Sequence, residues 1–247
     1  MTRLVWDGCV NVRDLGGLAT ARGVPTQFGR IVRADNVQRL SARGWRALEN
    51  HGVRRIVDLR MRREIALDPG AAAPVEIVNV SVLGEWDDEI QAFYDAKLDA
   101  SDGAAPYLVW SYLDFLDRYQ ENFGRAVQAI ADAPHGAVVV HCMGGKDRTG
   151  IVAALLLRLV GVDNRAIAED YALSEANLAE RHQIWVDQAV GAADRRRRSL
   201  LLPTPAAAML DVLEVIDSRH GGAGRYLAGA GVTDAGLARL EERLVAP

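Results

Sequence analysis

VVVHCMGGKDRTG, residues 138–150, leads from three apolar β-formers through a glycine-containing loop into the apolar run Ile151–Leu157. The short apolar segment Ala137–Val140 predicts a buried strand of a parallel sheet, and Thr149–Leu159 predicts an apolar helix that ends at Gly161. The order strand, tight loop, helix places the loop at the positive N-terminal end of a helix, where anions bind.

The segments before this unit alternate between helical and strand patterns. Leu40–Gly52 predicts a helix with Ser41 as its cap, and Arg55–Arg60 and Val75–Val82 predict strands. Tyr107–Ala131 predicts one long helix with regularly spaced apolar residues. This alternation predicts an α/β fold with a central, mostly parallel sheet flanked by helices.

The rest of the chain is predicted to complete a single domain over residues 1–247. The glycine-rich stretch up to Arg33 predicts irregular strand or hairpin structure, and Asp68–Pro74 predicts a loop. After Gly161 three further helices are expected, with a break at Leu200–Pro205 and a turn at Gly221-Gly222 between the last two: Asp163–Val190, Pro205–Arg219 and Thr233–Val245.

The composition excludes several classes of protein. A net charge of -4 over 247 residues gives no overall attraction for nucleic acid, so any attraction for an anionic substrate must be local. The two cysteines, Cys9 and Cys142, have no disulfide-framework or zinc-ligand spacing, and no other metal-ligand cluster is evident. Met1–Gly17 lacks the apolar core of a signal peptide, and no run is long enough to span a bilayer. We therefore expect a metal-free, cytoplasmic protein with a simple buried thiol at Cys9, leaving leaderless secretion open.

The loop itself predicts phosphate chemistry, because Cys142 is followed by five residues and then Arg148. Successive backbone N–H groups in a tight loop form an anion-binding nest, and the glycines allow close backbone approach. The Arg148 guanidinium matches two phosphate oxygens, and thiols at helix N-termini near cations ionise readily. Thr149 is placed to donate its hydroxyl to the sulfur. We infer that Cys142 is a covalent nucleophile acting on a phosphate monoester.

Other interpretations of the loop are weaker. A nucleotide-binding P-loop needs a glycine where Val140 stands and Ser or Thr where Asp147 stands. A structural buried cysteine does not explain the surrounding pattern. A rhodanese or arsenate-reductase chemistry is disfavoured by Arg148, Thr149 and the lack of a nearby resolving cysteine. A catalytically inactive phosphate-binding module stays open if no general acid is present.

The sequence resembles the bacterial tyrosine and lipid phosphatase family of the cysteine-dependent phosphatase superfamily, which includes secreted mycobacterial and Listeria members. The resemblance rests on His141–Gly150 and extends over nearly the whole chain through further motifs: Asn11–Gly17, Arg33–Asp35, Ile56–Arg60, Asp170–Ser174 and the region from Gly221 to Thr233. It implies a protein tyrosine phosphatase-like fold without cofactors, with residues 163–198 as a helical lid over the active site.

The resemblance also implies roles for individual residues. Cys142 would form a phosphocysteine, and Thr149 would assist the sulfur. Arg148 and the loop amides would hold the phosphate; these amides belong to Met143, Gly144, Gly145, Lys146, Asp147 and Arg148. Lys146 and Asp147 would face the substrate, whereas His141 would order the loop from beneath.

The general acid is less clearly marked. Asp147, in the loop, and Asp58, at the end of a strand, are the favoured candidates, and Asp58 is equally suited to pairing with a nearby arginine. Asp87 and Asp88, on an expected loop, stay possible. Asp114 and Asp117 fall on the expected long helix and are read as solvated, while Asp14 is read as bracing a loop.

The expected substrate is phosphotyrosine in proteins, with dual specificity toward phosphoserine and phosphothreonine, or activity on phosphoinositides, left open. A deep pocket would favour the phosphotyrosine ring, and a wide one with Lys146 exposed would favour phosphoinositides. No nucleic-acid partner or membrane insertion is expected, and the oligomeric state is not indicated. Arg195–Arg198 is read as a solvated helix end, with attraction for an anionic lipid or acidic peptide as the alternative.

Overall fold

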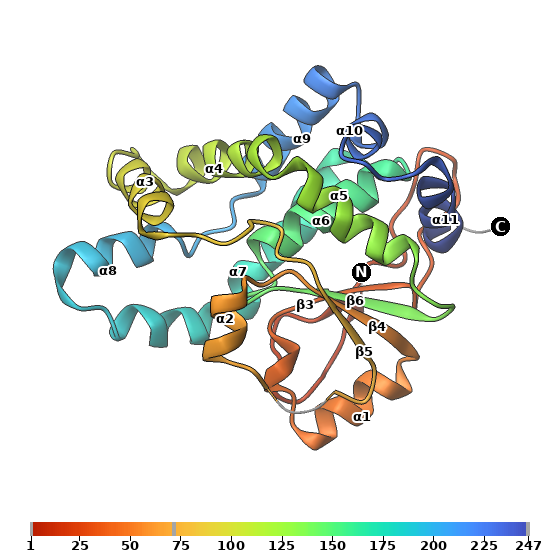
Figure 1. Ribbon diagram of the computed structural model, residues 1–247, viewed down its shortest axis with the longest axis horizontal. Coiled ribbons are helices and arrows are strands. Elements are labelled where there is room, and N and C mark those ends of the chain that lie inside the picture. Colours follow the sequence, from red (N-terminus) through yellow and green to blue (C-terminus); the bar gives the residue numbers. More distant parts are fainter. Residues whose placement is uncertain (1, 71–72, 246–247) are drawn as a thin grey trace.

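The structure, a computed structural model, describes residues 2–70 and 73–245 and is built on one mixed sheet (Figure 1). The sheet has the order β1-β2-β3-β6-β4-β5. Its strands are β1 (Thr2–Arg3), β2 (Arg13–Asp14), β3 (Ile31–Ala34), β4 (Val53–Asp58), β5 (Glu76–Asn79) and β6 (Ala137–His141). The strands from β3 to β5 pair in parallel, and β1 and β2 add antiparallel pairs at one edge. The predicted α/β fold with a mostly parallel sheet is confirmed.

Helices cover both faces of the sheet. One face packs against α1 (Ala42–Asn50) and the short 3₁₀ helix η1 (Val37–Arg39). The larger core lies on the other face, beneath several helices: α4 (Ala104–Arg118), α5 (Gln120–Ala131), α6 (Asp147–Leu159), α9 (Ala206–His220), α10 (Ala223–Gly229) and α11 (Asp234–Val245). Figure 1 shows α1 below the sheet and these helices above it. Alternating side chains of the central strands supply both cores, as expected for strands covered on two faces.

The strand register brings three strand ends to one edge of the sheet. Ala34 of β3 and Asp58 of β4 both lie opposite His141 of β6. The residue after His141 is Cys142, so the loop that carries the cysteine leaves the sheet where its neighbours also end. Ligands of open α/β sheets bind at this carboxyl edge.

Several predicted boundaries were wrong. The expected single helix Tyr107–Ala131 is two helices, because Tyr119 leaves the helical conformation (φ -118°, ψ 28°) and separates α4 from α5. Three short or charged helices were missed: α2 (Arg62–Leu67), α3 (Asp88–Asp99) and α10. Ala71 and Ala72 of the predicted loop Asp68–Pro74 lie outside the described residues.

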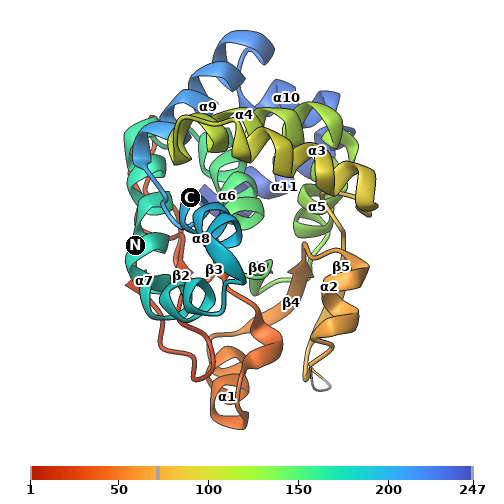
Figure 2. The same cartoon turned by 90° about the vertical axis from the view of Figure 1, so that its left-hand side faces the viewer.

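An arm of two helices crosses the carboxyl edge of the sheet. It consists of α7 (Asn164–Asp187) and α8 (Gly191–Leu200), at the position predicted for a lid. Figure 2 shows this arm in front of the strand ends, with α8 reaching toward α3. None of the helices in residues 2–70 and 73–245 is long and apolar enough to cross a membrane.

Candidate active site

The loop between β6 and α6 holds Cys142, whose side chain is buried. Gly145 has a left-handed φ of +63°, and a Cβ there would lie 2.3 Å from the Ala34 carbonyl oxygen. Only glycine therefore allows the loop to fold against the end of β3. The helix α6 begins at Asp147, two residues before the predicted start, so Asp147 and Arg148 belong to its first turn.

The carbonyl groups of this loop are held from outside by the surrounding framework. Asn11 Nδ2 donates to Gly144 O at 2.9 Å, and Arg33 Nη2 donates to Gly145 O at 2.8 Å. The other anchors are Asn36 N to Met143 O at 3.0 Å, Arg33 Nη2 to Lys146 O at 3.3 Å and the His141 Nδ1 contact with Cys142 O at 3.2 Å. These contacts fix the peptide planes of the loop.

The backbone N–H groups of the loop remain available as a result. From Met143 to Arg148 none of them donates a hydrogen bond to an acceptor in the part of the chain that the structure describes. A peptide unit is planar and trans, so its N–H points away from its anchored carbonyl. Successive free N–H groups at a helix N-terminus form a site for an anion.

Arg148 forms an ion pair with a residue that the sequence analysis did not single out. Its Nη1 and Nη2 donate to the two carboxylate oxygens of Glu64 in α2, at 2.5 and 2.7 Å. Burial alone would lower the pKa of Arg148, but the Glu64 hydrogen bonds and the nearby thiol outweigh it and raise this pKa. Burial likewise raises the pKa of Glu64, yet the contacts with Arg148 bring it below its ordinary value. The pair is therefore ionised on both sides at neutral pH.

Asp147 sits at the mouth of the loop with its side chain 38% exposed. Its Oδ1 accepts a hydrogen bond from the Tyr112 hydroxyl and lies 3.4 Å from Lys146 Nζ. Lys146 is almost buried, and its Nζ also donates to the Leu201 carbonyl at the end of the arm. Its ammonium is thus engaged between the loop and the arm.

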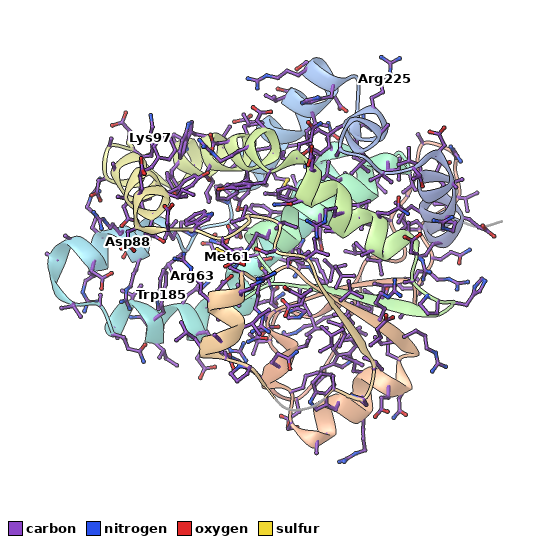
Figure 3. The ribbon with its side chains drawn as sticks, in the orientation of Figure 1. Met61, Arg63, Asp88, Lys97, Trp185 and Arg225 are labelled. Carbon is purple, nitrogen blue, oxygen red and sulfur yellow. The ribbon has the colours of Figure 1, made fainter. Side chains whose placement is uncertain are left out.

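Two cavities open on the loop. One, of about 440 Å³, is bordered by Arg148, Asp147 and Glu64 and has an aromatic wall formed by Trp86, Tyr94, Tyr107, Tyr112 and Phe115. The other, of about 600 Å³, is bordered by Met143, Gly144 and Lys146, with cationic groups on Arg39 and Arg181. Asp147, Trp185 and Leu201 border both cavities. Figure 3 shows Trp185, Arg63 and Asp88 at this end of the molecule.

Comparison with known proteins agrees with this geometry. A model of the tyrosine phosphatase family matches residues 4–246. The chain belongs to the tyrosine phosphatase family. It is 32% identical to a protein named tyrosine-protein phosphatase from Nostoc commune, over 87% of this chain and 74% of that one. It is 28% identical to the triple specificity protein phosphatase PtpB of Mycobacterium tuberculosis, over 94% of this chain and 95% of that one.

The other candidate acids of this phosphatase have surroundings very different from those of Asp147, and Asp58 is the first of them. Asp58 is buried and accepts hydrogen bonds from Arg60 Nε at 3.0 Å and Nη2 at 2.8 Å, with His141 Nε2 at 3.6 Å from its Oδ1. Burial raises the pKa of Asp58, but His141 and Arg60 more than compensate and lower it. A carboxylate so paired does not carry a proton at neutral pH, which favours the reading of Asp58 as a structural partner of an arginine.

Asp87 and Asp88 are not on a loop, as the sequence predicted, but at the start of α3. Asp87 caps this helix, since its Oδ1 accepts from Ile90 N at 2.8 Å, and Asp88 is exposed in the first turn. Both carboxylates therefore have the structural role typical of helix N-termini.

The remaining predicted residues fall into supporting positions. Asp14 is buried and accepts from Gly16 N at 2.8 Å and Gly29 N at 2.7 Å, as expected for a loop brace. The Thr149 hydroxyl is buried and has no hydrogen-bond partner among the residues that the structure describes. Cys9 donates to Asn36 O at 3.4 Å, and burial raises the pKa of its thiol.

Over the described ranges, no cluster of His, Cys, Asp or Glu side chains is placed to hold a metal ion.

The arginine run of the arm is not simply solvated. Arg197 binds Asp99 of α3 at 2.5 Å and lies 3.3 Å from Asp95. Arg198 pairs with Asp194 at 2.9 Å and stacks its guanidinium 5.2 Å from the Trp185 ring centre. These contacts tie α8 to α3 and hold Trp185 over the site.

Proposed function

We propose that this phosphatase hydrolyses phosphotyrosine in proteins through a phosphocysteine intermediate on Cys142. The observation that carries the proposal is the row of free N–H groups from Met143 to Arg148, beside a buried thiol at the N-terminus of α6. Such an arrangement binds a phosphate group and stabilises the charge that develops on its oxygens during transfer.

In the first step the Cys142 thiolate attacks phosphorus, so an S–P bond forms and the ester P–O bond breaks. The loop amides and Arg148 hold the non-bridging oxygens throughout. A guanidinium has five N–H donors. The hydrogen bonds to Glu64 take one on Nη1 and one on Nη2, which leaves the parallel pair Nε–H and Nη2–H for the phosphate. Glu64 thereby orients Arg148 without consuming its capacity to bind the substrate.

Asp147 supplies the proton that the departing tyrosine oxygen needs. It borders the same cavity as Arg148, and its carboxylate is partly exposed there, whereas Asp58 is enclosed by arginine contacts. A carboxylic acid within reach of the leaving oxygen accelerates such a step by about 10²- to 10⁴-fold.

In the second step water attacks the phosphocysteine, the S–P bond breaks and inorganic phosphate is released. Asp147, now ionised, accepts the proton from the water. The Thr149 hydroxyl, which is buried without a partner in the described chain, is available to donate to the departing sulfur. The cysteine returns as thiolate, ready for another cycle.

The aromatic wall of the smaller cavity supports an aryl phosphate as substrate, because aromatic rings pack favourably against one another. The larger cavity supports a second candidate, namely dual specificity or phosphoinositide hydrolysis. It places Arg39 and Arg181 around about 600 Å³ beside the loop, whereas Lys146, whose exposure would favour a phosphoinositide, is buried there. The relative from Mycobacterium tuberculosis is itself named a triple specificity phosphatase.

The first test is hydrolysis of p-nitrophenyl phosphate in EDTA and reductant. We expect activity in the wild type, none in Cys142→Ser and near wild-type activity in Cys9→Ser, the matched cysteine control. Activity that survives Cys142→Ser would refute the nucleophile. Phosphotyrosine, phosphoserine and phosphothreonine peptides and phosphoinositide vesicles then separate the two candidate functions by kcat/KM.

A further inference from the structure

A buried pair of tyrosines is hydrogen-bonded to the proposed acid. Tyr112 of α4 and Tyr171 of α7 are each 1% exposed, and their hydroxyl oxygens lie 2.8 Å apart. The Tyr112 hydroxyl donates to Asp147 Oδ1. Tyr112 thus links a second helix, far away in sequence, to one carboxylate oxygen of Asp147.

The direction of this hydrogen-bond chain follows from its proton count. Each phenol has a single O–H. Because Tyr112 donates its proton to Asp147, Tyr171 must be the donor to the Tyr112 oxygen. Burial, followed by the charge of Asp147, raises the pKa of Tyr112 and of Tyr171 well above the ordinary tyrosine value. Both hydroxyls therefore stay protonated throughout the neutral pH range.

The two oxygens of Asp147 are left in unequal surroundings. Oδ1 faces the Tyr112 hydroxyl and Lys146 Nζ, both donors. No residue in the described ranges donates a hydrogen bond to Oδ2. An oxygen that already accepts from donors is a poor place for a proton, so Oδ2 is the oxygen left open to carry one.

We propose that Tyr112 is a positioning residue that holds Asp147 so that its protonated Oδ2 faces the leaving group, with Tyr171 as the second link. This inference rests on the proposed role of Asp147 as the general acid. Tyr171 is itself fixed, because Gly150 of α6 lies against its ring and a Cβ at that glycine would come within 3.1 Å of it. The two hydroxyls thus fix the position of Asp147 relative to α6, the helix that follows the loop.

The test compares two aryl phosphates that bind alike but differ in leaving group. Nitrophenolate departs without a proton, whereas the more basic phenolate, with a conjugate-acid pKa of about 10, needs one. Because Asp147 also serves the hydrolysis step that both substrates share, the comparison uses kcat/KM, which reports phosphocysteine formation alone. Tyr112→Phe is expected to lower kcat/KM for phenyl phosphate about tenfold and kcat/KM for p-nitrophenyl phosphate less than about threefold. The matched control is Tyr226→Phe, which also removes a buried hydroxyl, bonded to Leu116 O at 2.8 Å one turn further along α4 and not to Asp147.

Asp147→Asn separates the inference from the function on which it rests. We expect a larger leaving-group effect than in Tyr112→Phe, and no further loss when the two changes are combined. An equal fall for both substrates in Tyr112→Phe, or additive losses in the double variant, overturns the positioning role alone. Asp147→Asn without a leaving-group effect overturns the acid and the inference with it. Should Tyr112→Phe fold poorly, Tyr171→Phe retains the direct bond and is expected to show a smaller effect of the same kind.

Discussion

Replacing Glu64 by glutamine tests whether the ion pair between Glu64 and Arg148 contributes to catalysis. Glutamine keeps the shape of the side chain and one acceptor oxygen, but its amide nitrogen meets an Arg148 donor. One of the two hydrogen bonds, at 2.5 and 2.7 Å, is therefore lost together with the charge of the carboxylate.

The magnitude follows from the burial of the pair. The side chains of Arg148 and Glu64 are 11% and 17% exposed, so solvent screens them little. A hydrogen bond to a charged group contributes about 1.5–3 kcal/mol. If that free energy holds the guanidinium in its productive orientation, kcat/KM falls about 10- to 150-fold. The melting temperature falls by about 3–12 °C, since a chain of this size loses about 2–4 °C per kcal/mol.

The assay measures kcat/KM for p-nitrophenyl phosphate well below the melting temperature of each variant. Glu76→Gln is the matched control, because Glu76 pairs with Arg55 at 2.8 Å on the sheet and not at the loop. A value for Glu64→Gln within about threefold of that for Glu76→Gln would refute the argument that Glu64 orients Arg148.

Two further predictions concern the surroundings of the loop. Arg33→Lys keeps the charge but loses the planar group that binds both Asp170 and the Gly145 carbonyl. The loss of one charged hydrogen bond, about 1.5–3 kcal/mol, lowers the melting temperature by about 3–12 °C by the same conversion. Calorimetry measures this fall, and kinetics is expected to show a reduced kcat/KM. Burial lowers the pKa of His141 below its ordinary value of about 6.5, and Asp58 only partly opposes this. The unfolded chain then binds the proton more readily, so this contribution to stability is complete above about pH 6.5 and is lost as the pH falls toward the lowered value. His141→Asn should flatten the dependence of the unfolding free energy on pH between 7 and 5, and an unchanged slope would contradict this assignment.

The parts of the fold that the sequence predicted well are those with a local signal. The strand β6 ends only one residue later than expected, and α6 starts only two residues earlier. Both boundaries could be predicted this closely because an apolar run and two glycines mark them. The helix α1 has Ser41 as its cap, whose Oγ accepts from Arg43 N and Gly44 N. Side-chain chemistry at these termini determines the structure without help from distant residues.

The features that were missed depend on tertiary contacts. The apolar pattern continues across Tyr119, so periodicity alone joins α4 to α5. Glu64 stands after two arginines and looks like part of a solvated charged run. Only the placement of α2 beside the loop brings it to Arg148. The same holds for Tyr112, whose helical spacing indicates a core residue and whose contact with Asp147 comes from the packing of α4 against the loop.

The helix α7 of the arm contacts both the support of the cysteine loop and the tyrosine pair beside Asp147. Asp170 of α7 binds Arg13 at 2.6 Å and Arg33 at 2.5 Å, and Arg33 in turn holds the loop carbonyls. The next residue, Tyr171, begins the hydroxyl chain to Asp147. A shift of α7 would therefore displace the loop amides and Asp147, the proposed proton donor, together. Since catalysis requires both to be in place at once, changes that loosen α7 should lower kcat more than they raise KM.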